Sequence, residues 1–549
     1  MVCPPAADSE FWLYDMILTL HRYIFKELLK IFVLSTVAMS LILSLGFLLK
    51  PIQNYGISPG QIFHLLGYLL PITLTFVLPM GALFAASMVY GRFAADRELD
   101  ACRASGISLW TLVYPALCLA ILVAMANLIL SFHVAPSFVH RSEKSVKANA
   151  EQILFRNLQR KGFYALPKST YRIYAEKADP KRKLLEGVII IDAKKDDIQR
   201  MITAGSAKVD IQAHADYNQV TITALDTYRV DDLAPVYMEE LVVSSQFESL
   251  LSDSIKFQKL DRLKSIRADK MKFFPVRQLA QQAYAQLTIE KVGEYLNDTI
   301  RASDRPIQLE DAEGIRTYLV RAKGCRVVET KDYTLEFLPP IQLTEMDKIR
   351  NEVICKYESQ QGVCRLENNA IGAKLELDID RPAWDRGGSL HGVALRKFIS
   401  NVLVPEPVRN KLVDKPVLQT LQQVGEDSTL LSRPSTRLIG YRNNVMTRLS
   451  RVNNEIDAEL HSRLVLGLGC VSLILTGTAL GIYLRGGHLL SAFGASAIPA
   501  GVLIVFILAG KEITKNPSTS AAMGVTVMWI GFVVLAALTL FLYRRLLKT

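Results

Sequence analysis

Six long apolar runs constrain this chain more than any other feature of its sequence. Each run holds about twenty or more residues without Asp, Glu, Lys or Arg, the length that an α-helix needs to cross a bilayer. A helix buried inside a soluble protein seldom stays uncharged over that length. We therefore expect six transmembrane helices, three near the start of the chain and three at its end. The runs are residues 31–49, 62–90, 107–132, 464–484, 489–510 and 521–543.

Composition agrees with a membrane protein and gives no support for a nucleic-acid partner. Half of the 549 residues are hydrophobic, which is a high share for a soluble chain of this length. The formal charge is +11, yet the basic residues are mixed with acidic ones along the chain and form no dense stripe. The excess of positive charge therefore does not predict binding to DNA or RNA.

Basic residues beside the apolar runs set the expected orientation, because loops that stay in the cytoplasm are enriched in Lys and Arg. All of them fall on one side of the membrane if the N-terminus is cytoplasmic, and the C-terminus is then cytoplasmic too. The long middle region, from about residue 134 to 461, would lie outside the cytoplasm. The basic residues in question are Arg22, Lys26, Lys30, Arg92, Arg97, Arg103, Arg485, Arg544, Arg545 and Lys548.

The middle region changes character along its length. From about residue 161 to 245, short β-branched and aromatic segments are separated by polar turns, a pattern that predicts an antiparallel jelly-roll or sandwich. A helical pattern follows near residues 273–284, and a second strand-rich stretch lies between residues 315 and 377. Apolar residues spaced by three and four then predict an amphipathic helix that leads into the fourth run. This helix either packs on the outer region or acts as a lever between that region and the membrane.

Two cysteines of the middle region could form a disulfide. Cys355 and Cys364 flank a short polar segment that is typical of a hairpin turn. A disulfide across such a hairpin is compatible with an extracytoplasmic location, and a free thiol at each position is the alternative. The chain has neither H-E-x-x-H nor paired C-x-x-C, so we expect no metal site.

The sequence also argues against chemistry within this chain. It lacks G-x-x-x-x-G-K-[ST], the loop that cradles nucleotide phosphates, so if ATP is used another subunit must bind it. Gly56-Ile-Ser-Pro-Gly60 matches the G-x-S-x-G pattern of hydrolases. It lies between two apolar runs, however, and not between a strand and a helix as a nucleophile would. We therefore expect no catalytic residues.

Two ionisable residues in or beside the apolar runs are candidates for contact with a substrate. His64 lies within the second run, where a polar side chain is costly and therefore indicates function. Lys50 follows the first run and could meet an anionic group. Anchoring at the membrane interface is the alternative for both residues.

The segment between the second and third runs is charged in an ordered way. Arg92 and Asp96 are four residues apart. Asp100 and Arg103 are three residues apart, so the members of each pair can meet on the surface of a helix. We expect a helix over about residues 91–106, with a solvated hairpin as the alternative.

This segment and its surroundings resemble the LptF/LptG (YjgP/YjgQ) family of lipopolysaccharide export permeases. The similarity rests on Leu78-Pro-Met-Gly-Ala-Leu83, Gly91-Arg-Phe-Ala-Ala-Asp-Arg-Glu-Leu99 and Arg103-Ala-Ser-Gly-Ile-Ser108. Glu459-Leu-His-Ser-Arg463 resembles the family's entry to its second membrane half. The resemblance covers about residues 20–285 and 440–549.

The resemblance implies a subunit of an ABC exporter that extracts lipopolysaccharide, or a related envelope lipid, from the inner membrane. Such subunits pair with a second permease of the same family and sit on a dimer of cytoplasmic ABC ATPases. Their periplasmic β-jelly-rolls pass the lipid to a periplasmic bridge of jelly-roll proteins. The resemblance makes the segment at 91–106 the coupling helix and assigns contact with the ATPase to Glu98, and with it to Arg92, Arg97 and Arg103. It implies no cofactor in this chain.

We therefore predict an α-helical inner-membrane protein with six transmembrane helices, three plus three, and a large periplasmic β-jelly-roll or sandwich domain. A membrane-anchored periplasmic ligand-binding or scaffold protein is the alternative. The predicted parts are a cytoplasmic segment at residues 1–30, helices one to three at 31–133, the jelly-roll at 134–285, a periplasmic insertion of mixed α/β structure at 286–435, an amphipathic connecting helix at 436–463 and helices four to six at 464–549.

Overall fold

The computed structural model describes residues 6–548 with several internal gaps. The gaps are residues 56–58, 149, 166–170, 195–196, 214–216, 231–234, 249–253, 303–305, 330, 332, 370–371, 388–390, 414–415, 425–429 and 485–488. The chain divides into two compact units. The helical unit comprises Met1–Val146, Ser254–Asp269 and Ser450–Thr549, and the strand unit comprises Lys147–Asp253 and Lys270–Leu449.

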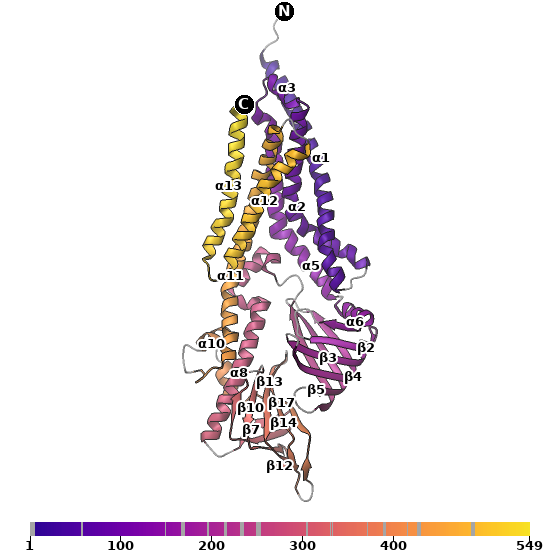
Figure 1. Ribbon diagram of the computed structural model, residues 1–549, viewed down its shortest axis with the longest axis vertical. Coiled ribbons are helices and arrows are strands. Elements are labelled where there is room, and N and C mark those ends of the chain that lie inside the picture. The colour runs from indigo at the N-terminus through magenta and orange to yellow at the C-terminus, as the bar shows by residue number, and fades with distance from the viewer. Residues whose placement is uncertain are drawn as a thin grey trace, which may run out of the picture. The chain divides into compact units, whose positions relative to one another are not determined.

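Six helices of the described chain are long and apolar enough to cross a membrane, so the prediction of six such helices is confirmed. Three precede the strand-rich part of the chain and three follow it, and Figure 1 shows the long helices of the helical unit running side by side. They are α1 (Ala6–Tyr55), α2 (Pro59–Ala95), α4 (Leu109–Ile129), α11 (Thr436–Tyr483), α12 (Leu489–Lys515) and α13 (Ala521–Lys548).

Helix α2 is the most enclosed of the first three, because it packs against both halves of the helical unit. Tyr90 is fully buried, and its hydroxyl donates a hydrogen bond to the backbone oxygen of Leu112 at 2.7 Å. On the side of α11, a Cβ added to Gly481 would lie only 2.8 Å from the backbone oxygen of Ser87. Glycine therefore permits an approach of the two helices that a larger residue would prevent.

The charged segment that follows α2 is not the single helix expected over residues 91–106. Helix α2 continues to Ala95, the backbone then turns through Arg97, which has a left-handed φ of 59°, and α3 (Glu98–Ala104) begins directly afterwards. A left-handed residue cannot continue an α-helix, and the turn lets the buried Leu99 reach the helical core. The prediction of one continuous helix is therefore wrong, although both flanks are helical.

The first sheet of the strand unit is a simple antiparallel meander, in which each strand pairs with the next one along the chain. Its apolar face includes Ile173, Ile190 and Ile222, and the helix α6 (Ala150–Lys161) covers this face with Leu154 and Phe155. The strands are β1 (Phe163–Ala165), β2 (Tyr171–Asp179), β3 (Leu184–Lys194), β4 (Asp197–Ala213), β5 (Tyr217–Val230) and β6 (Val236–Glu248). The strands match the predicted segments, but they form one sheet and not the predicted two-sheet jelly-roll or sandwich.

Two sheets occur instead in the part of the chain that follows. After α8 (Phe274–Ala302), successive strand pairs alternate between a sheet ordered β16-β15-β12-β11-β8-β7 and a sheet ordered β17-β14-β13-β10-β9. The strands are β7 (Ile307–Glu310), β8 (Arg316–Arg321), β9 (Gly324–Val327), β10 (Thr334–Leu338), β11 (Ile341–Asp347), β12 (Glu352–Ser359), β13 (Gln361–Asn369), β14 (Gly372–Asp380), β15 (Ala383–Asp385), β16 (His391–Val393) and β17 (Arg396–Leu403). Short helices α9 (Glu406–Val413) and α10 (Val417–Gln423) precede α11.

Cys355 and Cys364 are free thiols, which is the second of the two alternatives that the sequence left open. The two cysteines do not lie on one hairpin. Strand β12, with Cys355, pairs with β11 and β15, whereas β13, with Cys364, pairs with β10 and β14. The short polar segment between them is a corner at which the chain passes from one sheet to the other.

The predicted amphipathic helix and the fourth apolar run form one continuous helix, α11. Its apolar stripe is buried at Val445, Leu449, Val452 and Ile456. Leu460, at the end of the stripe, is half-buried. The amphipathic pattern therefore matches the burial along this helix, and the two alternatives drawn from the sequence stay open.

Candidate functional site

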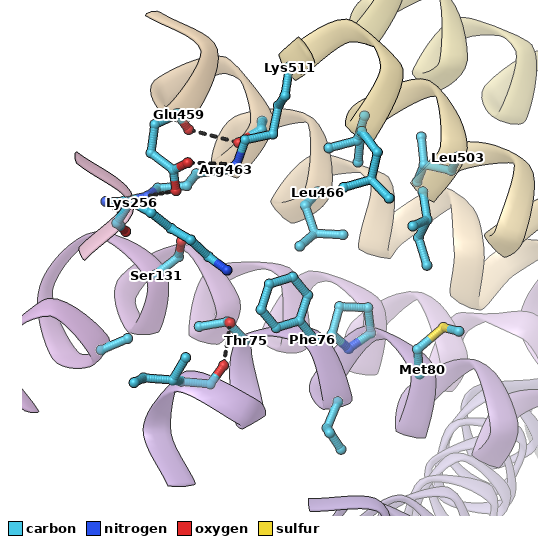
Figure 2. Close-up of a pocket in the computed structure, with 18 of the residues that line it drawn as sticks. Thr75, Phe76, Met80, Ser131, Lys256, Glu459, Arg463, Leu466, Leu503 and Lys511 are labelled. Carbon is cyan, nitrogen blue, oxygen red and sulfur yellow. Dashed lines mark hydrogen bonds and ion pairs between the residues drawn. The ribbon is translucent and has the colours of Figure 1, made fainter. Parts of the chain in front are cut away.

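A cavity of about 620 Å³ lies within the helical unit. It is lined by α1, α2, α11, α12 and the start of α5 (Ala135–Ala148), together with the π-helical turn η1 (Leu130–Val134) and the 3₁₀ turn η2 (Ile255–Phe257). Most of its wall is apolar, as Figure 2 shows for Phe76, Met80, Leu466 and Leu503. The other apolar lining residues are Met39, Ile42, Leu43, Ile72, Val77, Pro79, Ala135, Pro136, Phe257, Leu473, Ala500, Ile504, Ile507 and Leu508.

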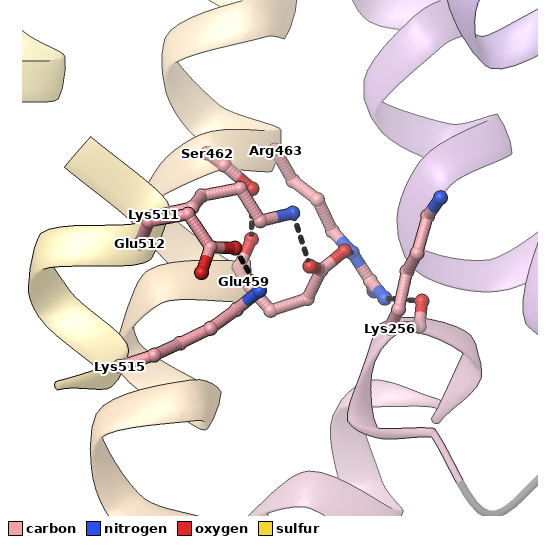
Figure 3. Close-up of polar contacts among 7 residues, drawn as sticks. All are labelled: Lys256, Glu459, Ser462, Arg463, Lys511, Glu512 and Lys515. Carbon is pink, nitrogen blue, oxygen red and sulfur yellow. Dashed lines mark hydrogen bonds and ion pairs between the residues drawn. The ribbon is translucent and has the colours of Figure 1, made fainter. Parts of the chain in front are cut away.

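One end of this cavity is charged (Figure 3). Four cations and two carboxylates line it, which leaves a formal excess of two positive charges. The cations are Lys256, Arg463, Lys511 and Lys515, and the carboxylates are Glu459 and Glu512. A ligand with an apolar part and an anionic group would match both ends of the cavity.

Glu459 holds two of the four cations. Its Oε1 accepts a hydrogen bond from Nε of Arg463 at 3.1 Å, one turn further along α11. Its Oε2 accepts a hydrogen bond from Nζ of Lys511, on α12, at 2.6 Å. The side chain of Glu459 is only 9% exposed, so these bonds compensate a carboxylate that has lost nearly all of its hydration.

Arg463 is held from three sides and still has a free donor. Its Nη2 donates to the backbone oxygen of Lys256 at 2.8 Å, and its guanidinium lies 5.5 Å from the ring centre of Phe132 in the π-helical turn. The side chain is 5% exposed. Its Nη1 is buried and has no hydrogen-bond partner among the described residues. A buried donor without a partner is costly, and this one belongs to a residue that lines the cavity.

Of the four cations that line the cavity, Lys256 forms no ion pair with a residue that the structure describes. Its ammonium lies 5.5 Å from the ring centre of Phe76 and 5.4 Å from that of Phe257, and Figure 2 shows it extending toward Phe76. Burial lowers the pKa of Lys256, and the nearby cations lower it further against the opposing effect of Glu459. Aromatic faces stabilise an ammonium only in part, so an anion beside Lys256 would gain a strong interaction.

Lys515 lies nearer to water than the other cations. Its Nζ donates to Oε1 of Glu512 at 2.8 Å, and the two side chains are 38% and 76% exposed. An exposed pair of this kind contributes little to stability. Lys515 can therefore exchange its partner for a ligand more easily than Arg463 or Lys511.

The substrate contacts predicted from the sequence, Lys50 and His64, stay predictions. The side chains of Lys50 and His64 lie outside the part of the chain whose side chains the structure describes. The four cations of the cavity were missed, although two spacings could have indicated them. Glu459 and Arg463 lie one helical turn apart before the fourth run, and Lys511 and Lys515 lie one turn apart after the fifth. Lys256 has no such signal, because about two hundred residues separate it from its neighbours on α11.

The residues expected to contact an ATPase lie around α3. Asp96, Arg97 and Glu98 are all exposed. Arg92 is half-buried, and its Nη1 donates to Oε1 of Glu27 on α1 at 3.2 Å, so Asp96 is not the partner that the spacing predicted. Arg103 lies in the last turn of α3 and is half-buried. Arg97 and Glu98 form no ion pair with the residues that the structure describes.

Comparisons with known proteins identify a family for this chain. The sequence profile of a family described as lipopolysaccharide export system permease LptF/LptG matches residues 22–305, which is more than half of the chain. A curated relative, the uncharacterized protein RP871 of Rickettsia prowazekii (strain Madrid E), is 23% identical over 197 residues. The match covers 35% of this chain and 53% of that protein, so the chain spans about half the length of the relative.

Proposed function

Because the chain belongs to the LptF/LptG family of lipopolysaccharide export system permeases, we propose that it is the membrane subunit of an exporter for lipopolysaccharide or a related anionic envelope lipid. It would take the lipid from the inner membrane and pass it toward the outer membrane. In this proposal the chain itself catalyses no reaction, and ATP hydrolysis takes place in a separate subunit.

The observation that supports this function most directly is the amphipathic cavity. An acyl chain that moves from the bilayer to an apolar cavity exchanges one apolar environment for another and gains little free energy. Selectivity must therefore come from the head group. Four cations at one end, with an excess of two positive charges, supply such selectivity for an anionic lipid and none for a neutral one.

Helix α2 could transmit movement from the ATPase to the lipid, because it connects α3 to the cavity. Phe76 and Met80, near its middle, line the cavity, and α3 follows directly after its C-terminal end. A partner that moves α3 would move α2 with it, because Leu99 of α3 is buried in the same core as Tyr90. We infer that Glu98, Arg97 and Arg103 contact the ATPase, while Arg92 holds α2 to α1 through Glu27.

The proposed assembly contains a dimer of cytoplasmic ABC ATPases, a second permease of the same family and a periplasmic bridge protein of jelly-roll type. Both termini and α3 would lie in the cytoplasm, and the strand unit would lie in the periplasm. The distribution of basic residues beside the apolar runs supports this orientation.

Lipid binding can be tested with a charge reversal in the cavity and a matched control. Lys515→Glu removes an accessible cation of the cavity, whereas Lys548→Glu makes the same change at the exposed end of α13. Lipid that co-purifies with the full-length protein in mild detergent is quantified by mass spectrometry. We expect Lys515→Glu to reduce bound anionic lipid about fivefold or more and Lys548→Glu to leave it unchanged. Equal amounts of lipid on both variants would contradict the assignment of the cavity.

Coupling can be tested on two neighbouring exposed carboxylates. Glu98→Lys should abolish co-purification of an ATP-binding protein from native membranes, because a repulsive charge would replace an attractive one at the contact. Asp96→Lys makes the same change two residues earlier, on the same exposed turn, and should retain most of the partner. A wild-type protein that brings down no ATPase under mild conditions would refute the exporter assignment.

A further inference from the structure

Glu459 has a place in the cavity that the transport function alone does not explain. A cavity selective for anions should not contain a buried carboxylate, since it repels an anionic ligand. Yet Glu459 lies at the charged end, where its two oxygens bind one cation each. Figure 3 shows it between Arg463 and Lys511, two residues that a ligand would otherwise use.

The geometry of Glu459 is that of a bound anionic group. One oxygen accepts from Arg463 at 3.1 Å and the other from Lys511 at 2.6 Å. A phosphate of a ligand would bridge an arginine and a lysine in the same way, with separate oxygens. The carboxylate therefore occupies a position at which the cavity could bind an anion.

Two other donors at this end are not taken by a carboxylate. They are the ammonium of Lys256, which lies against aromatic rings, and the buried Nη1 of Arg463, which has no partner within the described part of the chain. An unpartnered, deeply buried donor in the wall of a cavity points to an acceptor on a ligand. Neither donor has to be released from a carboxylate before it can bind an anionic group.

We propose that Glu459 is a specificity-determining residue that acts as a built-in anion, so that the cavity accepts one phosphate group of a lipid readily and a second one only by displacing Glu459 from Lys511. This inference rests on the proposed function of the cavity. A phosphate carries about −1.5 to −2 charges at pH 7, which matches the excess of two positive charges at this end. Two phosphates together would carry more negative charge than this excess can neutralise, unless Glu459 moves away.

The experiment compares two probes, monophosphoryl and diphosphoryl lipid A, on the full-length protein in detergent. Native mass spectrometry over a titration yields the ratio of the two Kd values. Glu459→Gln keeps the shape of the side chain but removes its charge, so Arg463 and Lys511 become available to the second phosphate. We expect the preference for the diphosphoryl probe over the monophosphoryl one to rise about tenfold.

Asp457→Asn is the matched control. Asp457 lies on the same helix and pairs with Arg267, and it is not part of the cavity wall. The substitution changes the net charge by the same amount as Glu459→Gln, so a general effect of charge would appear in both variants. We expect the ratio to change less than twofold in Asp457→Asn.

The possible failures can be told apart. If both probes bind the wild type more tightly than a neutral amphiphile such as dodecyl maltoside, but Glu459→Gln leaves their ratio unchanged, the role of Glu459 is refuted and the proposed function stands. If neither phosphorylated probe binds more tightly than the neutral one, the proposed function itself fails.

A second variant covers the case in which Glu459→Gln does not fold. Glu459→Gln with Lys511→Gln removes a carboxylate and a cation together and so preserves the net charge. The second phosphate then loses its lysine, and we expect the diphosphoryl preference to fall about threefold below that of the wild type. An unchanged ratio in this double variant would overturn the proposal.

Discussion

Two buried glutamates, one in each unit of the molecule, have the same partners in different surroundings. In the strand unit, Glu345 of β11 accepts hydrogen bonds from Arg316 at 2.6 Å and Lys397 at 2.9 Å. In the helical unit, Glu459 likewise holds one arginine and one lysine. Both carboxylates are nearly inaccessible, with side chains 3% and 9% exposed. Each lies between two cations, which is the least costly way to bury a single carboxylate.

The difference lies in what the cations face. Arg316 and Lys397 are 51% and 23% exposed, so water hydrates them, and the hydroxyl of Tyr357 adds a third donor to Glu345 at 3.4 Å. Arg463 and Lys511 are only 5% and 16% exposed and line an apolar cavity. The first arrangement is complete without a ligand. The second leaves a buried donor unsatisfied, and this contrast is the physical reason to assign binding to the helical unit.

Replacing each glutamate by leucine should give the largest difference between the two sites. Glu459→Leu leaves two buried cations without an anion, and we expect a loss of about 3–5 kcal/mol in the stability of the helical unit. Glu345→Leu leaves cations that water can reach, so we expect a loss of about 1–2 kcal/mol in the strand unit. Hydrogen exchange of α11 and β11 in the full-length protein measures the two effects separately. Equal losses would remove the contrast between the sites.

Replacing Lys256 should have a smaller effect, on the affinity for an anionic lipid, and this effect should depend on pH. Lys256→Gln should weaken binding of an anionic lipid about tenfold, because it removes a buried positive charge. Only the ammonium form attracts an anion, and burial lowers the pKa of Lys256 from the ordinary 10.5. Wild-type affinity should therefore fall as the pH rises through that lowered pKa, below the pH at which an ordinary lysine loses its proton.

The control for this prediction is the variant itself. Lys256→Gln has no group to titrate at that position, so its affinity should stay flat over the same interval while the wild type declines. Binding measured from pH 7 to 10 in detergent checks the two profiles. Parallel profiles would show that another group, and not Lys256, responds to the change in pH.

The smallest expected effect is a difference in thiol reactivity between the two units. It compares the cavity of the helical unit, which a ligand can enter, with the closed interior of the strand unit. Ser131 lines the cavity, so Ser131→Cys should react with a small maleimide at pH 8, and bound lipid should slow this reaction. In the strand unit, burial raises the pKa of Cys364 and raises that of Cys325 to about 12. Both thiols should stay protonated and unreactive until the unit unfolds.

Peptide-level mass spectrometry distinguishes these cysteines from the native ones of the helical unit. The control is the same reaction in denaturant, where Cys325, Cys364 and the introduced cysteine should all be modified. Modification of Cys364 in the folded protein at the rate of Ser131→Cys would mean that the interior of the strand unit is open.

The parts of the fold that the sequence predicted are those decided by local pattern. Uncharged apolar runs identified the six long helices, and β-branched segments between turns identified the strands of the first sheet. Hydrophobic periodicity is a property of neighbouring residues, so it can be read without knowing what packs on them. The same pattern could not indicate how strands associate, and the predicted jelly-roll is a single meander.

Errors arose where one residue or one corner redirects the chain. Arg97 adopts a left-handed backbone that splits the predicted coupling helix, although neither its residue type nor the charge spacing around it indicated a break. The segment between Cys355 and Cys364 has the composition of a hairpin turn but connects two sheets. Local propensity is the same for a hairpin turn and for a corner between two sheets. Contacts with distant strands decide which of the two forms.

The sequence by itself determined that this chain has six helices able to span a membrane, a strand-rich middle region and a charged segment after the second helix. It also placed Glu459 and Arg463 one helical turn apart. Only the tertiary structure decided that Lys256 and Lys511 join them at one end of an apolar cavity. Apolar periodicity acts through each residue's own neighbours, whereas a binding site depends on side chains that distant segments bring together when their apolar faces pack.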